Sequence, residues 1–97
     1  MKYIVQLEIS PEVGGDMEEH PERIQQWMQK WQALNPVGMY FGLTRRATTI
    51  IVDVPNEDVM LEALHDTWVL TKSYPTVWPV GDASEFPAIM QRIGLVP

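Results

Sequence analysis

The stretch KYIVQLEI at residues 2–9 alternates between apolar and mixed positions, and this alternation decides the fold. Successive side chains of an extended strand point to opposite faces of a sheet. One face therefore carries Tyr3, Val5, Leu7 and Ile9, and the other carries Lys2, Ile4, Gln6 and Glu8. The pattern predicts a first strand with one buried face and one face of mixed polarity.

A helix is predicted to follow over residues 21–34. Pro21 suits the first turn, where its missing N–H needs no partner. Apolar side chains then recur at the spacing of one helical face, and Asn35-Pro36 ends the segment. This stripe consists of Ile24, Trp27, Met28, Trp31 and Leu34. Residues 10–20, with Gly14 and Gly15, are expected to form a loop.

Three more strands and two more helices are expected downstream. The strands cover residues 37–43, 47–54 and 76–80, and the helices cover residues 57–70 and 85–93. Gly38 and Gly42 indicate a bulge or a close backbone approach in the second strand. The helix at 57–70 is expected to turn one stripe to the core, formed by Met60, Leu61, Leu64 and Trp68.

The order strand, helix, strand, strand, helix, strand predicts one α+β domain over residues 1–97 with a ferredoxin-like antiparallel sheet. Both helices then cover one face of the sheet. The uncovered face is too apolar for comfortable exposure and too polar for a plain core. Two such faces are expected to meet in a homodimer and close a dimeric α+β barrel, and a solvated sheet in a monomer is the alternative.

Composition excludes several classes of protein. Thirteen acidic against seven basic residues give a net charge of −6, opposite to what binding to nucleic acid requires. The chain has no cysteine, so no disulfide or thiolate chemistry is possible. No apolar run is long enough to span a membrane, and the first residues lack the features of a signal peptide. We expect a cytoplasmic protein with neither nucleic acid nor membrane as a partner.

The third quarter of the chain contains Val52-Asp53-Val54-Pro55, then Glu62-Ala63-Leu64-His65-Asp66-Thr67, then Tyr74-Pro75. This stretch of sequence resembles the corresponding part of the muconolactone isomerase family, which are small cofactor-free enzymes of the dimeric α+β barrel class. The residues between Pro55 and Glu62 form a segment about one helical turn longer than in the family pattern. The resemblance implies the barrel fold and proton-transfer chemistry, while related barrel families differ in activity.

Three residues are candidates for acid or base catalysis. His65 has the side chain best suited to proton transfer near neutral pH, although a helix histidine beside an apolar stripe is commonly structural. Glu8 and Asp53 fall on the uncovered face, where a second chain would remove them from water. Either carboxylate also fits a solvated strand end. His20, before Pro21, is interpreted as a helix-entry residue.

Five residues are candidates for ligand binding. Tyr40, Thr49 and Trp78 share the uncovered face, where they line either a cavity or the dimer contact. Arg45 and Arg46, at the tip of the predicted hairpin, suit bidentate binding of a carboxylate, although paired arginines in a turn are often solvated. The sequence contains no metal-ligand spacing, phosphate loop or dinucleotide fingerprint, so neither a metal nor a cofactor is expected.

Three functions remain open from the sequence. The first is a cofactor-independent enzyme that moves a proton on a small cyclic or carbonyl acid. The second is a non-catalytic oligomeric module for binding or assembly. The third is a monooxygenase without metal or flavin, which needs a substrate that activates oxygen itself.

Overall fold

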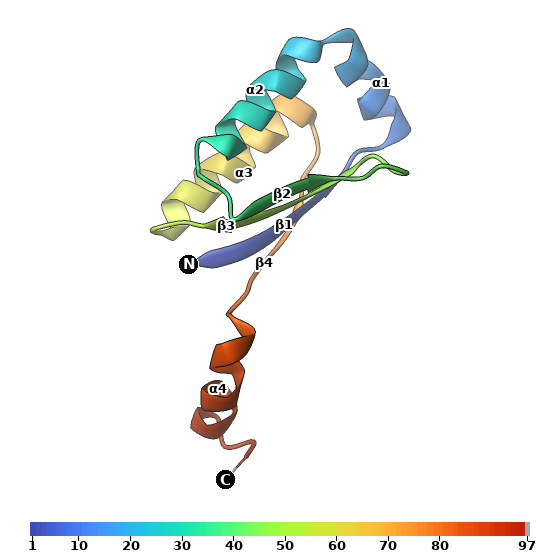
Figure 1. Cartoon of the computed structure of the whole chain (residues 1–97). Coiled ribbons are helices and arrows are strands. Elements are labelled where there is room, and N and C mark those ends of the chain that lie inside the picture. Colours follow the sequence, from blue (N-terminus) through green and yellow to red (C-terminus); the bar gives the residue numbers. More distant parts are fainter. Residues whose placement is uncertain (97) are drawn as a thin grey trace.

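The computed structural model describes residues 1–96 and contains one four-stranded sheet with helices (Figure 1). In chain order the elements are β1 (Lys2–Glu8), α1 (Pro11–Glu19), α2 (Pro21–Gln32), β2 (Gly38–Phe41), β3 (Ala47–Asp53), α3 (Glu57–Thr71), β4 (Thr76–Pro79), the 3-10 turn η1 (Ala83–Glu85) and α4 (Phe86–Arg92). The predicted α+β class with an antiparallel sheet is confirmed.

The strands lie in the order β2-β3-β1-β4, and every neighbouring pair is antiparallel. Because β1 and β2 both run antiparallel to the strand between them, they are parallel to each other. The same reasoning makes β3 and β4 parallel on either side of β1. Two β-α-β units therefore interleave in one sheet.

Strand pairing fixes which side chains share a face. Val5 lies opposite Ile50, and both are buried in the core with Leu7 and Val52. Figure 1 shows α2 and α3 on one side of the sheet, which is the side that these residues face. The other side, termed the open face below, carries Ile4, Gln6, Glu8, Tyr40, Thr49, Ile51, Asp53, Thr76 and Trp78. The predicted alternation is confirmed.

The expected loop at residues 10–20 is wrong, because this segment contains α1 (Pro11–Glu19). Ser10 caps the helix: its hydroxyl accepts a hydrogen bond from the backbone N–H of Val13, and Pro11 follows in the first turn. These start signals outweigh the helix-weakening effect of Gly14 and Gly15. Met17 is buried, so tertiary packing supports the short helix as well.

The predicted inner face of α3 is also wrong in part. The helix turns Met60, Ala63, Thr67 and Thr71 inward, whereas Leu61 is exposed and Trp68 is 44% exposed. The reason is a bulky partner: the indole of Trp31 on α2 is almost fully buried against α3, and small side chains leave room for it. Trp31 Nε1 donates a hydrogen bond of 2.9 Å to the Thr67 hydroxyl, which fixes the rotation of α3.

The chain after β4 leaves the body of the fold. Figure 1 shows η1 and α4 extending away from the sheet on the side opposite α2 and α3. The longest dimension of the molecule is 57 Å, and its radius of gyration is 16.0 Å. A globular chain of this length has a radius of gyration of about 12 to 13 Å. Residues 80–96 are termed the C-terminal arm.

The Trp31–Thr67 bond predicts a specific coupling between α2 and α3. Thr67→Val removes the acceptor, so the buried indole N–H of Trp31 stays unpaired, and the free energy of unfolding falls by about 1 to 3 kcal/mol. In a Trp31→Phe background, which has no N–H, the same change at Thr67 costs less. Urea denaturation of the four chains measures the coupling. An equal cost of Thr67→Val in both backgrounds contradicts this role.

Candidate functional site

The loop between β2 and β3 sends two neighbouring arginines to opposite sides of the sheet. Arg45 Nη2 donates to Glu8 Oε1, which lies on the open face at the end of β1. Arg46 Nη2 donates to Glu18 Oε1 on α1. A Cβ on Gly42 would collide with the carbonyl oxygen of Arg45, so glycine allows the tight path of this loop. Arg45 and Arg46 therefore do not form one carboxylate clamp.

The open face has a hollow of about 500 Å³ beside this loop. Polar and aromatic side chains from β1, β2, β3 and the start of β4 surround it, so it offers several hydrogen-bonding groups to a small polar ligand. We term it the Glu8 hollow; its lining includes Gln6, Glu8, Tyr40, Arg45, Thr49 and Tyr74. The structure thus brings together four of the predicted site residues, namely Glu8, Tyr40, Arg45 and Thr49.

Strand register explains the position of these groups. Thr49 lies opposite both Tyr40 on β2 and Gln6 on β1, so the three side chains form one row across the open face. The ring of Tyr40 lies over Gly38, where a Cβ would be 2.7 Å from the ring atom Cε2. The close approach predicted from the glycine therefore occurs between a backbone position and an aromatic ring.

Glu8 and Arg45 form the charged end of the hollow. In one chain their side chains are 66% and 64% exposed, respectively. An ion pair this exposed contributes little to folding, since solvent screens the charges. The pair is therefore available to exchange partners: an incoming carboxylate can take the place of Glu8 on the Arg45 guanidinium.

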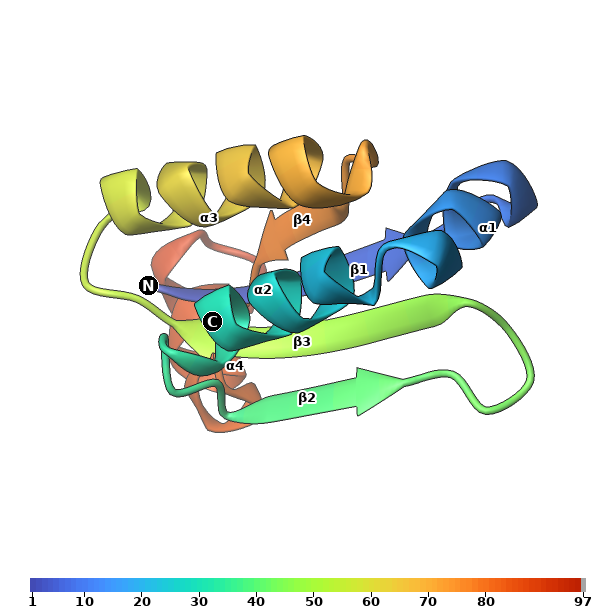
Figure 2. The same ribbon diagram turned by 90° about the horizontal axis from the view of Figure 1, so that it is seen from above.

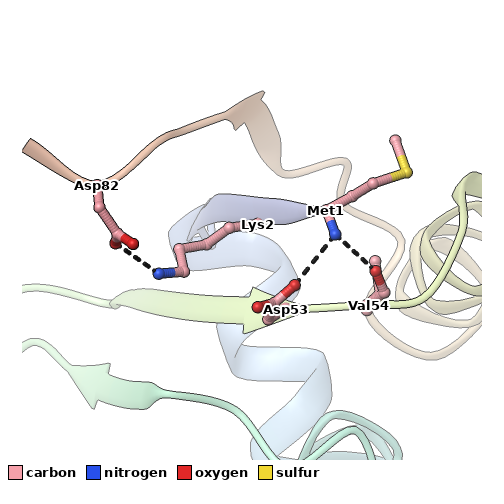
Figure 3. Close-up of polar contacts among 5 residues, drawn as sticks. All are labelled: Met1, Lys2, Asp53, Val54 and Asp82. Carbon is pink, nitrogen blue, oxygen red and sulfur yellow. Dashed lines mark hydrogen bonds and ion pairs between the residues drawn. The ribbon is translucent and has the colours of Figure 1, made fainter. Parts of the chain in front are cut away.

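Asp53 lies on the open face but outside the hollow. It pairs with Lys2 in the register, six residues along β1 from Glu8, a separation of about 20 Å in a strand. Asp53 Oδ1 instead accepts a hydrogen bond of 3.0 Å from the Met1 amine, which also donates to the Val54 carbonyl (Figure 3). Asp53 and Glu8 do not share a site within one chain.

His65 and Trp78 also lie apart from Glu8. His65 is exposed on α3, which covers the other face of the sheet, so it does not reach the hollow of its own chain. Trp78 lies opposite Ile4 in the next row of the open face, and Ile4 lies opposite Ile51. These three residues form an apolar row next to the polar one.

A second cavity lies on the helix side of the same loop. It has a volume of about 560 Å³ and is mostly apolar, with Trp27, Met28, Met39 and Phe41 in its lining, although Arg45 and Arg46 line it as well. We term it the β2 groove, because Figure 2 shows β2 extending beyond the helix layer at this edge of the sheet. It contains no carboxylate or histidine, so it offers no acid or base.

One cluster has potential metal ligands. Asp16, Glu19 and His20 place three ligand atoms within 4.8 Å of one another where α1 meets α2. Arg23 already donates to Asp16 Oδ2 at 3.0 Å, and His20 Nδ1 lies 3.4 Å from Glu22 Oε1. Protein groups thus neutralise or engage two of the three ligands, and the cluster is not assigned as a metal site. His20 is at the start of α2, as predicted.

Tyr74 is the hollow residue that the sequence did not single out, and Gln6 was placed on the uncovered face without a role. The alternation of the fourth strand contained a signal for Tyr74. If the two-residue period is extended toward the N-terminus of that strand, positions 74, 76 and 78 share one face. The ring of Tyr74 also lies 5.6 Å from that of Trp68, measured between centroids, so α3 helps to hold it.

Comparison of this chain with protein-family models, with curated proteins and with solved structures finds no match. Within residues 1–96, none of the helices has the length and apolar character needed to cross a membrane.

The root of the C-terminal arm yields a prediction about Lys2. A hydrogen bond of 2.8 Å to Asp82 Oδ1, together with the charge of that carboxylate, raises the pKa of Lys2 (Figure 3). Because the pKa is raised in the folded state, the stabilisation is present at neutral pH and is lost as pH rises through the pKa of Lys2. Asp82→Asn should lower that pKa, as followed by NMR titration of the Lys2 side chain. Glu85→Gln, a weaker charge neighbour, should lower it less, and an unchanged pKa in Asp82→Asn contradicts the pairing.

Proposed function

We propose that the chain works as a homodimer of ferredoxin-like subunits whose open faces meet and enclose the Glu8 hollow. The interleaved β-α-β units and the single helix layer support the fold class. The mixed character of the open face supports the pairing, since Ile4, Ile51 and Trp78 lie in one apolar row beside the polar row of the hollow. A second open face would bury the apolar row and cover Glu8.

Within this enclosure we propose cofactor-independent proton transfer on a small cyclic or carbonyl acid. The single observation behind the proposal is the convergence of Glu8, Arg45, Tyr40 and Thr49 in one hollow. Arg45 would bind the substrate carboxylate and so release Glu8 from its ion pair. The Glu8 carboxylate would take a proton from a carbon next to the carbonyl and return it to another carbon, which leaves no net redox change.

The neighbouring polar groups suit the intermediate of such a reaction. Removal of the proton leaves negative charge on the carbonyl oxygen, and the Tyr40 and Thr49 hydroxyls can donate hydrogen bonds to it. Gln6, in the same row, adds an amide donor. This chemistry agrees with the resemblance to muconolactone isomerases, which remains part of the proposal.

The apolar row favours one alternative, a non-catalytic dimeric module for binding or assembly. In that case Ile4, Ile51 and Trp78 serve the contact between chains, and the hollow either holds a ligand without turnover or is filled by the partner. The monooxygenase hypothesis draws no specific support from this arrangement, since it depends on the substrate rather than on these side chains.

Exchange of substrate protons with deuterium, followed by NMR on a panel of small lactone and oxo acids, tests the proposed reaction. Glu8→Gln should slow the exchange by about 100-fold to 10,000-fold, because it removes the base and keeps the shape. Asp53→Asn is the matched control and should leave the rate near that of the unmodified chain. Thermal stabilisation by these acids without any exchange would favour the binding module, and full exchange in Glu8→Gln would contradict the role of Glu8.

A further inference from the structure

The C-terminal arm carries an apolar stripe that the described residues of its own chain cover only in part, since Phe86 and Ile93 are exposed while Ile89 and Met90 are half-buried. Phe86, Ile89, Met90 and Ile93 recur at i, i+3, i+4 and i+7 along α4 and beyond its end. No residue of α4 is buried, and Phe86 is 59% exposed. A helix of seven residues is not stable in water by itself, so it needs a surface that covers this stripe.

Hydrogen bonds at the start of the arm direct the arm away from the rest of its own chain. The backbone N–H of Val80 donates to the Lys2 carbonyl, and Lys2 Nζ donates to Asp82. These bonds hold the first residues of the arm at the start of β1 and at the β4 edge of the sheet. Figure 1 shows that the arm then continues past the open face, on the side where a second chain would lie.

The same molecule has an uncovered apolar surface of matching character, the β2 groove. Its lining includes Ile24, Met28, Met39 and Phe41. Trp27, also in the lining, is buried, yet its indole N–H has no hydrogen-bond partner among the described residues. A buried N–H without an acceptor is costly, so a water molecule or a group from another chain would stabilise this indole.

The groove of one chain is out of reach of its own arm. It lies at the β2 edge, near Thr48, which pairs with Leu7, whereas the arm starts at the β4 edge, beside Lys2. The two places are therefore diagonally opposite corners of the sheet. They are separated by about 14 Å across three strand spacings and by about 17 Å along the strands, and they lie on opposite faces.

We propose that the arm of one chain docks in the β2 groove of a second copy, so that two chains exchange arms. This inference rests on the proposed pairing of open faces. Two sheets can pack face to face with their strands near right angles. A two-fold axis between them can then lie along the sheet diagonal that joins the other two corners, away from both the arm and the groove. That axis places the arm corner of each chain over the groove corner of the other.

The arm is long enough for this exchange. Residues 80–82 span about 10 Å when extended, and the 3-10 turn η1 adds about 6 Å. The sum exceeds the spacing of about 10 Å between face-packed sheets. The stripe on α4 can therefore pass the edge of the partner's sheet and enter its groove, where Phe86 and Met90 would cover the apolar lining.

Disulfide trapping tests the exchange directly, because the chain has no native cysteine. Full-length Met90→Cys, with the cysteine on the arm stripe, is mixed with a mass-tagged Met28→Cys chain, with the cysteine in the groove, and then oxidised. We expect the linked hetero-pair at tenfold or more the yield obtained with Gln91→Cys, whose side chain is on the opposite face of α4. A yield equal to that of this control overturns the inference.

Two further readouts separate this inference from the proposed pairing. Sedimentation of the same chains before oxidation reports their mass: a dimer that gives no Met90–Met28 link overturns arm exchange and leaves the pairing intact, whereas a monomer overturns both. A chain that carries both cysteines and links only within itself shows that the arm reaches its own groove, which also overturns the inference.

Discussion

The two-residue period of β1 and β3 is the constraint on which this structure depends. It sends Val5, Leu7, Ile50 and Val52 under the helices and leaves the residues between them on the open face. A shift of one residue in either strand would bury Glu8 or Asp53 and expose the core, so the register is strongly specified. The same alternation therefore builds the core and composes the open face.

The Glu8 hollow follows from this constraint together with one loop. The two-residue period places Glu8, Gln6 and Thr49 on the open face, and the glycine-dependent turn after β2 adds Arg45 to the same side. Arg46, one residue later, is drawn to Glu18 on α1. Two adjacent and chemically identical side chains thus acquire different roles because the loop lies at the boundary between the two faces.

Most of the fold was predictable from the sequence, because strand alternation and the stripe of α2 are strong local signals. The rotation of α3 was not predictable from periodicity, since both of its faces are apolar. What decides it is a tertiary contact: the buried Trp31 requires a hydroxyl acceptor and small neighbours, which only the Ala63–Thr67 face provides. The helix α1 was missed because two glycines were weighted above the Ser10-Pro11 start signal.

The candidate site was predictable to the extent that it depends on the alternation of side chains along the strands. Glu8, Tyr40 and Thr49 come together as expected, because they are neighbours in the register. Asp53 was grouped with them because it shares the open face, and His65 because of its chemistry. The structure places Asp53 at the far end of that face, opposite Lys2, and His65 across the sheet on α3. Distance along a strand and the side of the sheet, rather than residue type, decide which groups can share a substrate.

The pairing of two open faces is the central claim, and sedimentation equilibrium of the full chain at micromolar concentration tests it most directly. The unmodified chain should sediment at twice its mass of 11.1 kDa. Ile51→Asp places a charge in the middle of the open face and should sediment as a single chain, while Gln25→Asp on the solvent side of α2 should remain paired. An unmodified chain that sediments at 11.1 kDa, or an Ile51→Asp chain that still sediments as a dimer, would contradict the account.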